Sequence, residues 1–160
     1  MNFTVGMGTY VITDREDGIL RTFGLASCIA VTAYCPVKKV AGMIHVVLPS
    51  PLNEKDKLER PVYFAKTGIP IMIHKICRRY GCKRVDLFIQ MFGGADSMVN
   101  KDIYMVAKQN IQVAKTCIAD MGLAIGNSQL RGNQSRTLEM HVKTGKVKVF
   151  SHPFCSNFTC

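Results

Sequence analysis

Apolar and polar positions in the first third of the chain follow the pattern of short β-strands separated by turns. Compact apolar runs predict strands over residues 10–13, 19–22, 29–34 and 40–48. Asp17 and Gly18 predict a turn between the first two runs, and residues 35–39 predict a hairpin link between the last two. We therefore expect most neighbouring strands to pair as hairpins.

Two longer segments carry apolar residues at helical spacing, which predicts two amphipathic helices. The first is marked by apolar residues at intervals of three or four: Ile69, Ile73, Ile76 and Tyr80. Thr67 is its expected N-cap, and Gly81 suits the position just past its C-terminus. The second is expected between residues 100 and 121, with an apolar stripe formed by Ile103, Ala107, Ile111, Ala114, Ile118 and Met121.

The remaining segments predict a polar loop, further strands and a tail. Residues 53–60 are polar and predict a surface loop. Strands are expected over residues 84–92, 123–125, 137–142 and 146–150, with Thr144 and Gly145 as the turn of a final hairpin. Residues 151–160 show no periodicity and are expected to form a flexible tail.

The balance of elements predicts the fold class. Strands outnumber helices and most of them are hairpin neighbours, which favours an α+β protein over a doubly wound parallel fold. We expect a layered sandwich of mostly antiparallel or mixed β-sheet with two main helices packed on the outside. The chain has 160 residues, of which 48% are apolar, and this suits one compact domain. We place that domain at residues 1–150.

The charge and the cysteine content of the chain limit which functional classes it fits. The 21 Lys and Arg exceed the 11 Asp and Glu, and the net charge of +10 favours acidic partners. These cations are scattered, with no run as long as a nucleic-acid-binding patch, so a solvated basic surface is the simpler interpretation. The seven cysteines include no Cys-x-x-Cys, and neither a secretory leader nor an 18-residue apolar stretch is present. We therefore expect a cytoplasmic protein with reduced thiols and no membrane insertion.

Cys28 and His45 are the main candidates for chemistry. A cysteine hydrolase needs a histidine near its thiol, because an adjacent imidazolium stabilises the nucleophilic thiolate. Gly24 permits a tight bend before Cys28, and such a bend can direct the backbone N–H groups of Ser27 and Cys28 to one point as an oxyanion hole. Equal arms about the 35–39 link place residue 28 opposite residue 45 or 46, so the two side chains are expected to approach each other.

Pattern alone leaves other interpretations open. A cysteine beside apolar residues is more often a small buried hydrophobe, and a histidine within an apolar strand is often a core residue. His74, Cys77 and Cys82 offer three zinc-binding side chains, but their spacing fits no common zinc module. The sequence shows no phosphate loop, dinucleotide fingerprint or placed carboxylate pair, so no metal and no cofactor are predicted.

Residues 22–49, TFGLASCIAVTAYCPVKKVAGMIHVVLP, resemble the CheD family of chemoreceptor glutamine deamidases. The likeness rests on the threonine, the Ser-Cys pair, the Gly-Met-Ile-His stretch and the closing Leu-Pro. Further matches are Gly68-Ile69-Pro70, the Phe-Gly-Gly-Ala segment 92–95, Asn110 at a position before a helix, and the Gly/Arg segment 132–136. The likeness extends over residues 1–150. Departures occur at Ala26, 106–109 and 130–132, none of which is a candidate catalytic position.

The resemblance implies an enzyme that converts glutamine side chains of chemoreceptors to glutamate and releases ammonia. It implies Cys28 as the nucleophile, His45 as the acid and base, and Thr22 as the residue that orients the imidazole. It also implies a fold similar to the catalytic domain of cytotoxic necrotizing factor toxins. Candidate substrate or partner contacts are Phe92, Gly93 and Gly94.

The expected partners are the cytoplasmic helices of methyl-accepting chemoreceptors and, where one is present, a CheC-type phosphatase. Nucleic acid is not expected among them. Two other functional classes compete with the enzyme: a non-catalytic adaptor that binds receptors and the phosphatase, and a basic nucleic-acid-binding module, which no recognition motif supports. A Cys28→Ala protein separates the enzyme from the adaptor, because an adaptor should keep its binding and its cellular function without this cysteine.

Overall fold

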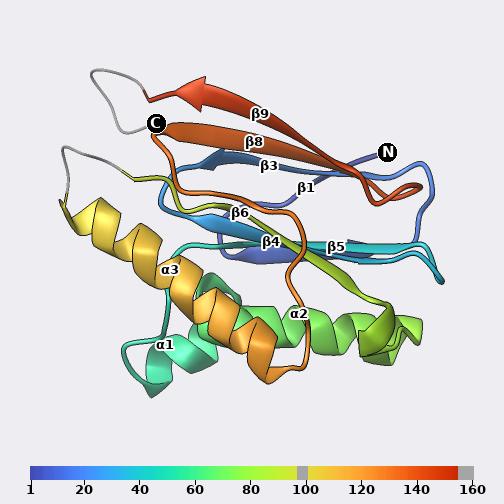
Figure 1. Cartoon of the computed structure of the whole chain (residues 1–160). Coiled ribbons are helices and arrows are strands. Elements are labelled where there is room, and N and C mark those ends of the chain that lie inside the picture. The colour runs from blue at the N-terminus through green and yellow to red at the C-terminus, as the bar shows by residue number, and fades with distance from the viewer. Residues whose placement is uncertain (97–100, 155–160) are drawn as a thin grey trace.

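The computed structural model describes the backbone of residues 1–96 and 101–154, and the side chains of all of these except 101–104. Within this part, the chain forms three layers: a four-stranded sheet on one outer side, a five-stranded sheet in the middle, and helices on the other outer side (Figure 1). This arrangement confirms the predicted α+β class with mixed sheets and two long helices. The likeness to the necrotizing factor domain stays a prediction.

Each sheet combines antiparallel pairs with one parallel pair at an edge. The four-stranded sheet has the order β1 (Asn2–Thr4), β3 (Ile19–Leu25), β8 (Gln134–His141) and β9 (Val147–Pro153). The five-stranded sheet has the order β2 (Thr9–Thr13), β5 (Val40–Val46), β4 (Ile29–Cys35), β6 (Phe88–Gly93) and β7 (Gln129–Leu130). The parallel pairs are β1 with β3 and β6 with β7.

The middle sheet is covered on both faces, so its central strands are buried on both sides. Side chains of a strand alternate between faces, and β4 shows this plainly. Ile29 and Val31 pack toward the helices, whereas Cys28 and Ala30 pack into the apolar layer between the two sheets. This double burial explains why β4 and β5 appear in the sequence as continuous apolar runs instead of alternating ones.

The helical layer contains α2 (Ala65–Tyr80), α3 (Lys101–Asp120) and the short α1 (Glu54–Glu59). The predicted stripes are confirmed, with Ile69, Ile73, Ile76, Ala107, Ile111, Ala114 and Ile118 buried, and Tyr80 and Met121 partly buried. The side chain of Ile103 lies outside the described residues. Gly81 ends α2 in the left-handed conformation, with φ +69°, as expected.

Two helix predictions were wrong. Residues 53–60 are not a loop, because Asn53 caps α1 by accepting a hydrogen bond from the Asp56 N–H at 2.8 Å. Thr67 is not the N-cap of α2, since the helix begins at Ala65 after Phe64, and Thr67 instead donates its hydroxyl hydrogen to the Pro61 carbonyl.

Strand predictions differ from the structure where pairing is non-local. Residues 84–86 form a 3₁₀ turn before β6, and residues 123–125 form no strand but a single bridge between Ile125 and Ile89. The predicted β4–β5 and β8–β9 hairpins are confirmed. β9 continues to Pro153, which pairs with Gln134 of β8. The strand therefore extends past residue 150, the predicted end of the domain. Residues 155–160 of the predicted tail lie outside the described residues.

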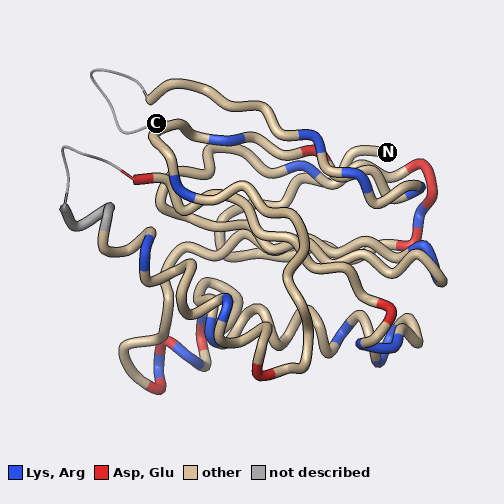
Figure 2. The backbone as a smooth tube through the Cα atoms, viewed as in Figure 1, with Lys and Arg blue, Asp and Glu red and all other residues tan. Residues whose placement is uncertain are grey.

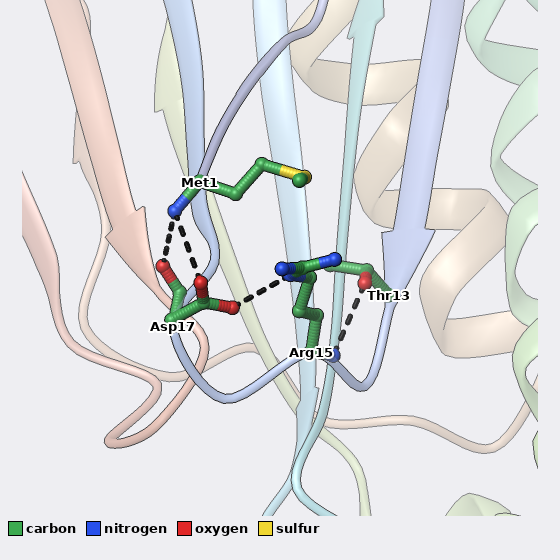
Figure 3. A network of polar contacts seen from close by, with 4 residues as sticks. All are labelled: Met1, Thr13, Arg15 and Asp17. Atoms are coloured by element: carbon green, nitrogen blue, oxygen red, sulfur yellow. Dashed lines mark hydrogen bonds and ion pairs between the residues drawn. The ribbon is translucent and has the colours of Figure 1, made fainter.

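β2 and β3 do not pair with each other, contrary to the hairpin expectation. Their connection crosses from the middle sheet to the outer one, and a polar network holds it (Figure 3). The Met1 amino group donates to the Asp17 backbone carbonyl at 2.7 Å, and Arg15 Nε donates to Asp17 Oδ1 at 2.7 Å. The hydrogen bond from Arg15 lowers the pKa of Asp17. The network anchors β1 beside β3, which brings Val5 next to Thr22.

None of the helices in the described part of the chain is long and apolar enough to cross a membrane. Lys and Arg lie on strands and helices of both outer layers instead of gathering in one segment (Figure 2). The charge pattern in space therefore agrees with the scattered pattern in the sequence.

Candidate active site

A β-bulge near the end of β3 delivers Cys28 to the middle sheet. Thr22 pairs with Leu138 and Leu25 pairs with Arg136, so three steps along β3 match two along β8. Gly24 adopts φ +65° within this bulge. The extra residue bends the chain, and residues 26–28 cross from the outer sheet to the start of β4. The bend expected before Cys28 is therefore present.

Cys28 and His45 face the same layer, although their register differs from the expected one. His45 lies opposite Ala30, so Cys28, two residues earlier on the same face, is its diagonal neighbour and not its direct partner. Diagonal Cα atoms on an antiparallel pair are separated by roughly 7–8 Å. The difference arises in the β4–β5 turn, where Cys35 pairs with Val40 and shortens the link to four residues.

Thr22 connects the outer sheet to His45. Its Oγ1 lies 2.7 Å from His45 Nδ1 and donates its hydrogen to the Val5 carbonyl, also at 2.7 Å. A carbonyl oxygen only accepts, so the single hydroxyl hydrogen is used there, and Nδ1–H must donate to Oγ1. The neutral imidazole therefore carries its proton on Nδ1, and Nε2 keeps a free lone pair.

Burial keeps both Cys28 and His45 in their neutral forms. Desolvation lowers the pKa of His45 from 6.5 to about 4 and raises the pKa of Cys28 from 9.0 to about 11, an increase slightly offset by its own backbone N–H. His45 Nε2 is buried without a hydrogen-bond partner among the described residues. Burial therefore favours a thiol beside a neutral imidazole in the substrate-free protein. The predicted thiolate mechanism stays a prediction.

The turn before Cys28 is held through its carbonyl groups. The Ala26 carbonyl accepts from the Ala95 N–H at 2.7 Å, and the Ser27 carbonyl accepts from Asn110 Nδ2 at 3.0 Å. In a trans peptide the N–H points opposite to the carbonyl. The N–H groups of Ser27 and Cys28 consequently point away from residue 95 and from α3. This orientation suits the predicted oxyanion role, which stays a prediction.

The segment 92–94 packs against the backbone of Cys28. Phe92 is buried in the layer between the sheets, and the Gly94 N–H donates to the Cys28 carbonyl at 2.9 Å. A Cβ on Gly93 would lie 2.4 Å from the same carbonyl oxygen, so only glycine permits this approach. In this structure these residues position the Cys28 backbone, while their role as substrate or partner contacts stays a prediction.

A family model described as "CheD chemotactic sensory transduction" matches residues 47–151 of the chain. The chain belongs to the CheD family. The matched range begins after His45, so this assignment does not depend on the three candidate catalytic residues. It confirms the family resemblance drawn from the sequence.

Relatives of this CheD-family chain match it over nearly its full length. A protein of Syntrophotalea carbinolica named "Probable chemoreceptor glutamine deamidase CheD" is 36% identical over 148 residues, or 91% of either chain. A protein of Thermococcus kodakarensis with the same name is 31% identical and covers 93% of this chain and 92% of its own. The crystal structure of Bacillus licheniformis hypothetical protein YfiH covers 77% of this chain and 49% of that one, at 17% identity and a TM-score of 0.49, a likeness too weak to inform function.

Some contributors to the site of this CheD-family chain have no recognisable signal in the sequence. Val5 acts through its backbone carbonyl, and Gly8 donates its N–H to the His45 carbonyl at 2.8 Å. Apolar residues that act through their backbone cannot be distinguished from core residues by pattern. Asn110 matches the family pattern, but it lies within α3 and not before a helix as expected.

The competing sites find less support in the described residues. His74 is exposed, and no group of three His, Cys, Asp or Glu there is arranged to hold a metal ion. A groove of about 890 Å³ is lined by β4, β6 and residues 122–127, but by none of Thr22, Cys28 and His45. Cys28 is only 9% exposed, so its side chain is largely shielded from solvent.

Proposed function

We propose that this chain hydrolyses the side-chain amide of glutamines on chemoreceptors, in the cytoplasm, to glutamate and ammonia. Cys28 is the nucleophile, His45 is the acid and base, and Thr22 orients the imidazole. The observation that carries the proposal is the Thr22–His45 hydrogen bond, which leaves Nε2 unprotonated in the layer that also holds Cys28. Family membership and the names of the relatives supply the reaction and the substrate class.

The neutral pair determines how the reaction begins. Burial raises the pKa of the Cys28 thiol and lowers the pKa of the His45 imidazole, so proton transfer between them is unfavourable before substrate binds. Attraction between the resulting charges lowers this cost. A standing thiolate is still scarce, so His45 Nε2 takes the thiol proton as sulfur attacks the glutamine Cδ carbonyl carbon.

His45 relays a proton in each later step. The tetrahedral oxyanion is held by the N–H groups of Ser27 and Cys28. The His45 imidazolium then protonates the amide nitrogen, which leaves as ammonia and gives a thioester. Water attacks the thioester while His45 accepts one of its protons, and that proton returns to the sulfur as glutamate is released.

The basic surface favours this substrate class. A net charge of +10 attracts acidic helices, and attraction between exposed charges weakens as salt increases. Figure 2 shows these cations spread over both outer layers, so they draw the partner in without marking a single binding patch.

A non-catalytic adaptor that binds chemoreceptors and a CheC-type phosphatase is the second candidate. It is favoured by the burial of Cys28, which raises the pKa of the thiol to about 11. A protein that works only by binding needs no reactive sulfur at position 28.

Deamidation of a purified receptor cytoplasmic fragment tests the proposal. Ammonia release is followed together with mass spectrometry of receptor peptides, where each converted glutamine gains about 1 Da. We expect Cys28→Ala to abolish both signals. Cys117→Ala, which removes a partly buried thiol on α3, is the matched control and should keep them. Full turnover by the Cys28→Ala protein would exclude Cys28 as the nucleophile, and receptor binding without any turnover in the wild type would favour the adaptor.

A further inference from the structure

Asn110 joins the two strands that carry Cys28 and His45. It lies on α3 and is fully buried, and its Nδ2 donates to the carbonyls of Ser27 and Val47, each at 3.0 Å. Both partners are carbonyl oxygens, which only accept, so the orientation of the amide group is determined and both of its hydrogens are used.

The two carbonyls lie where the strand ladder stops. The β4–β5 pairing begins at Ile29 and Val46, so Ser27 and Val47 are just beyond the final pair. Two carbonyls cannot bond to each other, and a side-chain amide with two donors satisfies both at once. Ser27 leads directly into Cys28, and Val47 follows His45 by two residues. Asn110 therefore connects the backbone of the nucleophile to the backbone of the base.

The stability that Asn110 contributes to the fold does not by itself explain why an asparagine occupies this position. The Asn110 Oδ1 atom is buried without a hydrogen-bond partner among the described residues. A buried acceptor left unpaired costs about as much free energy as a hydrogen bond contributes, so the two bonds made by Nδ2 are partly offset. This balance indicates that Asn110 contributes more to the geometry of the two strand ends than to stability.

We propose that Asn110 is a positioning residue that fixes the separation and orientation of Cys28 and His45. This inference rests on the proposed function, because it assigns Asn110 a part in the same reaction. Catalytic groups must be held close to their productive geometry, and a misplacement of about 1 Å costs about 10²-fold in rate. Asn110 supplies that constraint from the helical layer, on the side opposite to Thr22.

Deamidation kinetics provide the first test. Asn110→Ala should lower kcat by about 10- to 100-fold with little change in KM, because substrate still binds but the pair is misaligned. Asn110→Asp, whose buried carboxyl can donate one hydrogen bond only while protonated, should show an intermediate loss that deepens as pH rises. Gln109→Glu makes the same amide-to-carboxyl change at an exposed position of α3 and should leave both constants unchanged.

Alkylation by iodoacetamide, followed residue by residue with mass spectrometry, tests the same idea without substrate. Freeing the Ser27 carbonyl exposes Cys28 and lets its pKa fall from about 11 toward 9.0, so Asn110→Ala should accelerate alkylation of Cys28 by about tenfold or more. Cys35, which is fully buried, should stay protected if the variant is folded.

If Asn110 positions the pair, Asn110→Ala should lower kcat while it increases the reactivity of the Cys28 thiol. Unchanged Cys28 alkylation with unchanged kcat would overturn the inference, and equal exposure of Cys35 would show that Asn110 only stabilises the fold. A wild type without deamidase activity would refute the proposed function, while the alkylation result would still decide whether Asn110 holds Cys28.

Discussion

Replacing Thr22 by valine tests the central feature of the site. Thr22 and His45 are 0% and 1% exposed, and valine keeps the shape of threonine while removing Oγ1. The change leaves the Val5 carbonyl and His45 Nδ1 without the partner they share. Each buried group left unpaired costs about 1–3 kcal/mol, so the two together should lower the free energy of unfolding by about 2–6 kcal/mol.

Catalysis should suffer through the histidine tautomer. Without Oγ1 nothing holds the proton on Nδ1, and the form protonated on Nε2 cannot act as a base. Loss of the correct tautomer in a serine protease costs about 10⁴ in kcat when its aspartate is changed to asparagine. A neutral hydroxyl orients an imidazole less strongly than a carboxylate, so we expect a fall in kcat of about 10²-fold here.

The assay combines initial rates of ammonia release with ¹⁵N spectra of the His45 ring. Thr22→Ser keeps the hydroxyl and is the matched control, which should retain both the kcat and the Nδ1–H tautomer. An undiminished kcat in the Thr22→Val protein, or a ring spectrum identical to that of the wild type, would refute the role assigned to Thr22.

Other predictions concern stability and backbone geometry. Burial lowers the pKa of His45 from 6.5 to about 4, so the unfolded chain binds the proton first, and stability should be full above pH 6.5 and fall by roughly 3 kcal/mol as pH drops toward 4. Urea unfolding of His45→Asn should show no such loss of stability at acid pH. An equal dependence of the unfolding free energy on pH in this variant and in the wild type would contradict the prediction. Burial raises the pKa of Cys28 from 9.0 to about 11, so stability should be lost as pH rises from 9 toward 11, and less so in Cys28→Ala. Gly93→Ala should destabilise the protein by about 2 kcal/mol or more and lower kcat, because the added Cβ meets the Cys28 carbonyl at 2.4 Å and φ is +100°. Gly24→Ala, at φ +65° with nothing within 4 Å, is its control, and equal losses of stability and kcat in the two proteins would show that backbone strain alone matters.

Under the proposed function, burial of Cys28 and His45 restrains the reactivity of the thiol before substrate binds. A thiol with a pKa of about 11 is largely protonated at neutral pH, which protects it from unwanted alkylation and oxidation. Attack then depends on a substrate carbonyl that arrives where His45 can accept the proton. The proposed mechanism therefore links reactivity to substrate binding.

Local pattern was sufficient for much of the fold. The stripes of α2 and α3 and the β4–β5 and β8–β9 hairpins were predicted because residues within about four positions, or across a short turn, determine them. The crossing of β2 and β3 into different sheets was missed, since it depends on pairing with β5 and β8, far along the chain. The α2 start was missed for a related reason, because Thr67 bonds to Pro61 instead of capping the helix.

The amino-acid sequence by itself determined the candidate pair, the α+β class and the family resemblance, because side-chain chemistry and short-range spacing are written along the chain. Only the tertiary structure decided the register that makes Cys28 and His45 diagonal neighbours, the tautomer set by Thr22 and Val5, and the connection through Asn110. These features depend on backbone carbonyls and on burial between layers. Such groups are common to all residues, so their role emerges only when distant segments pack together.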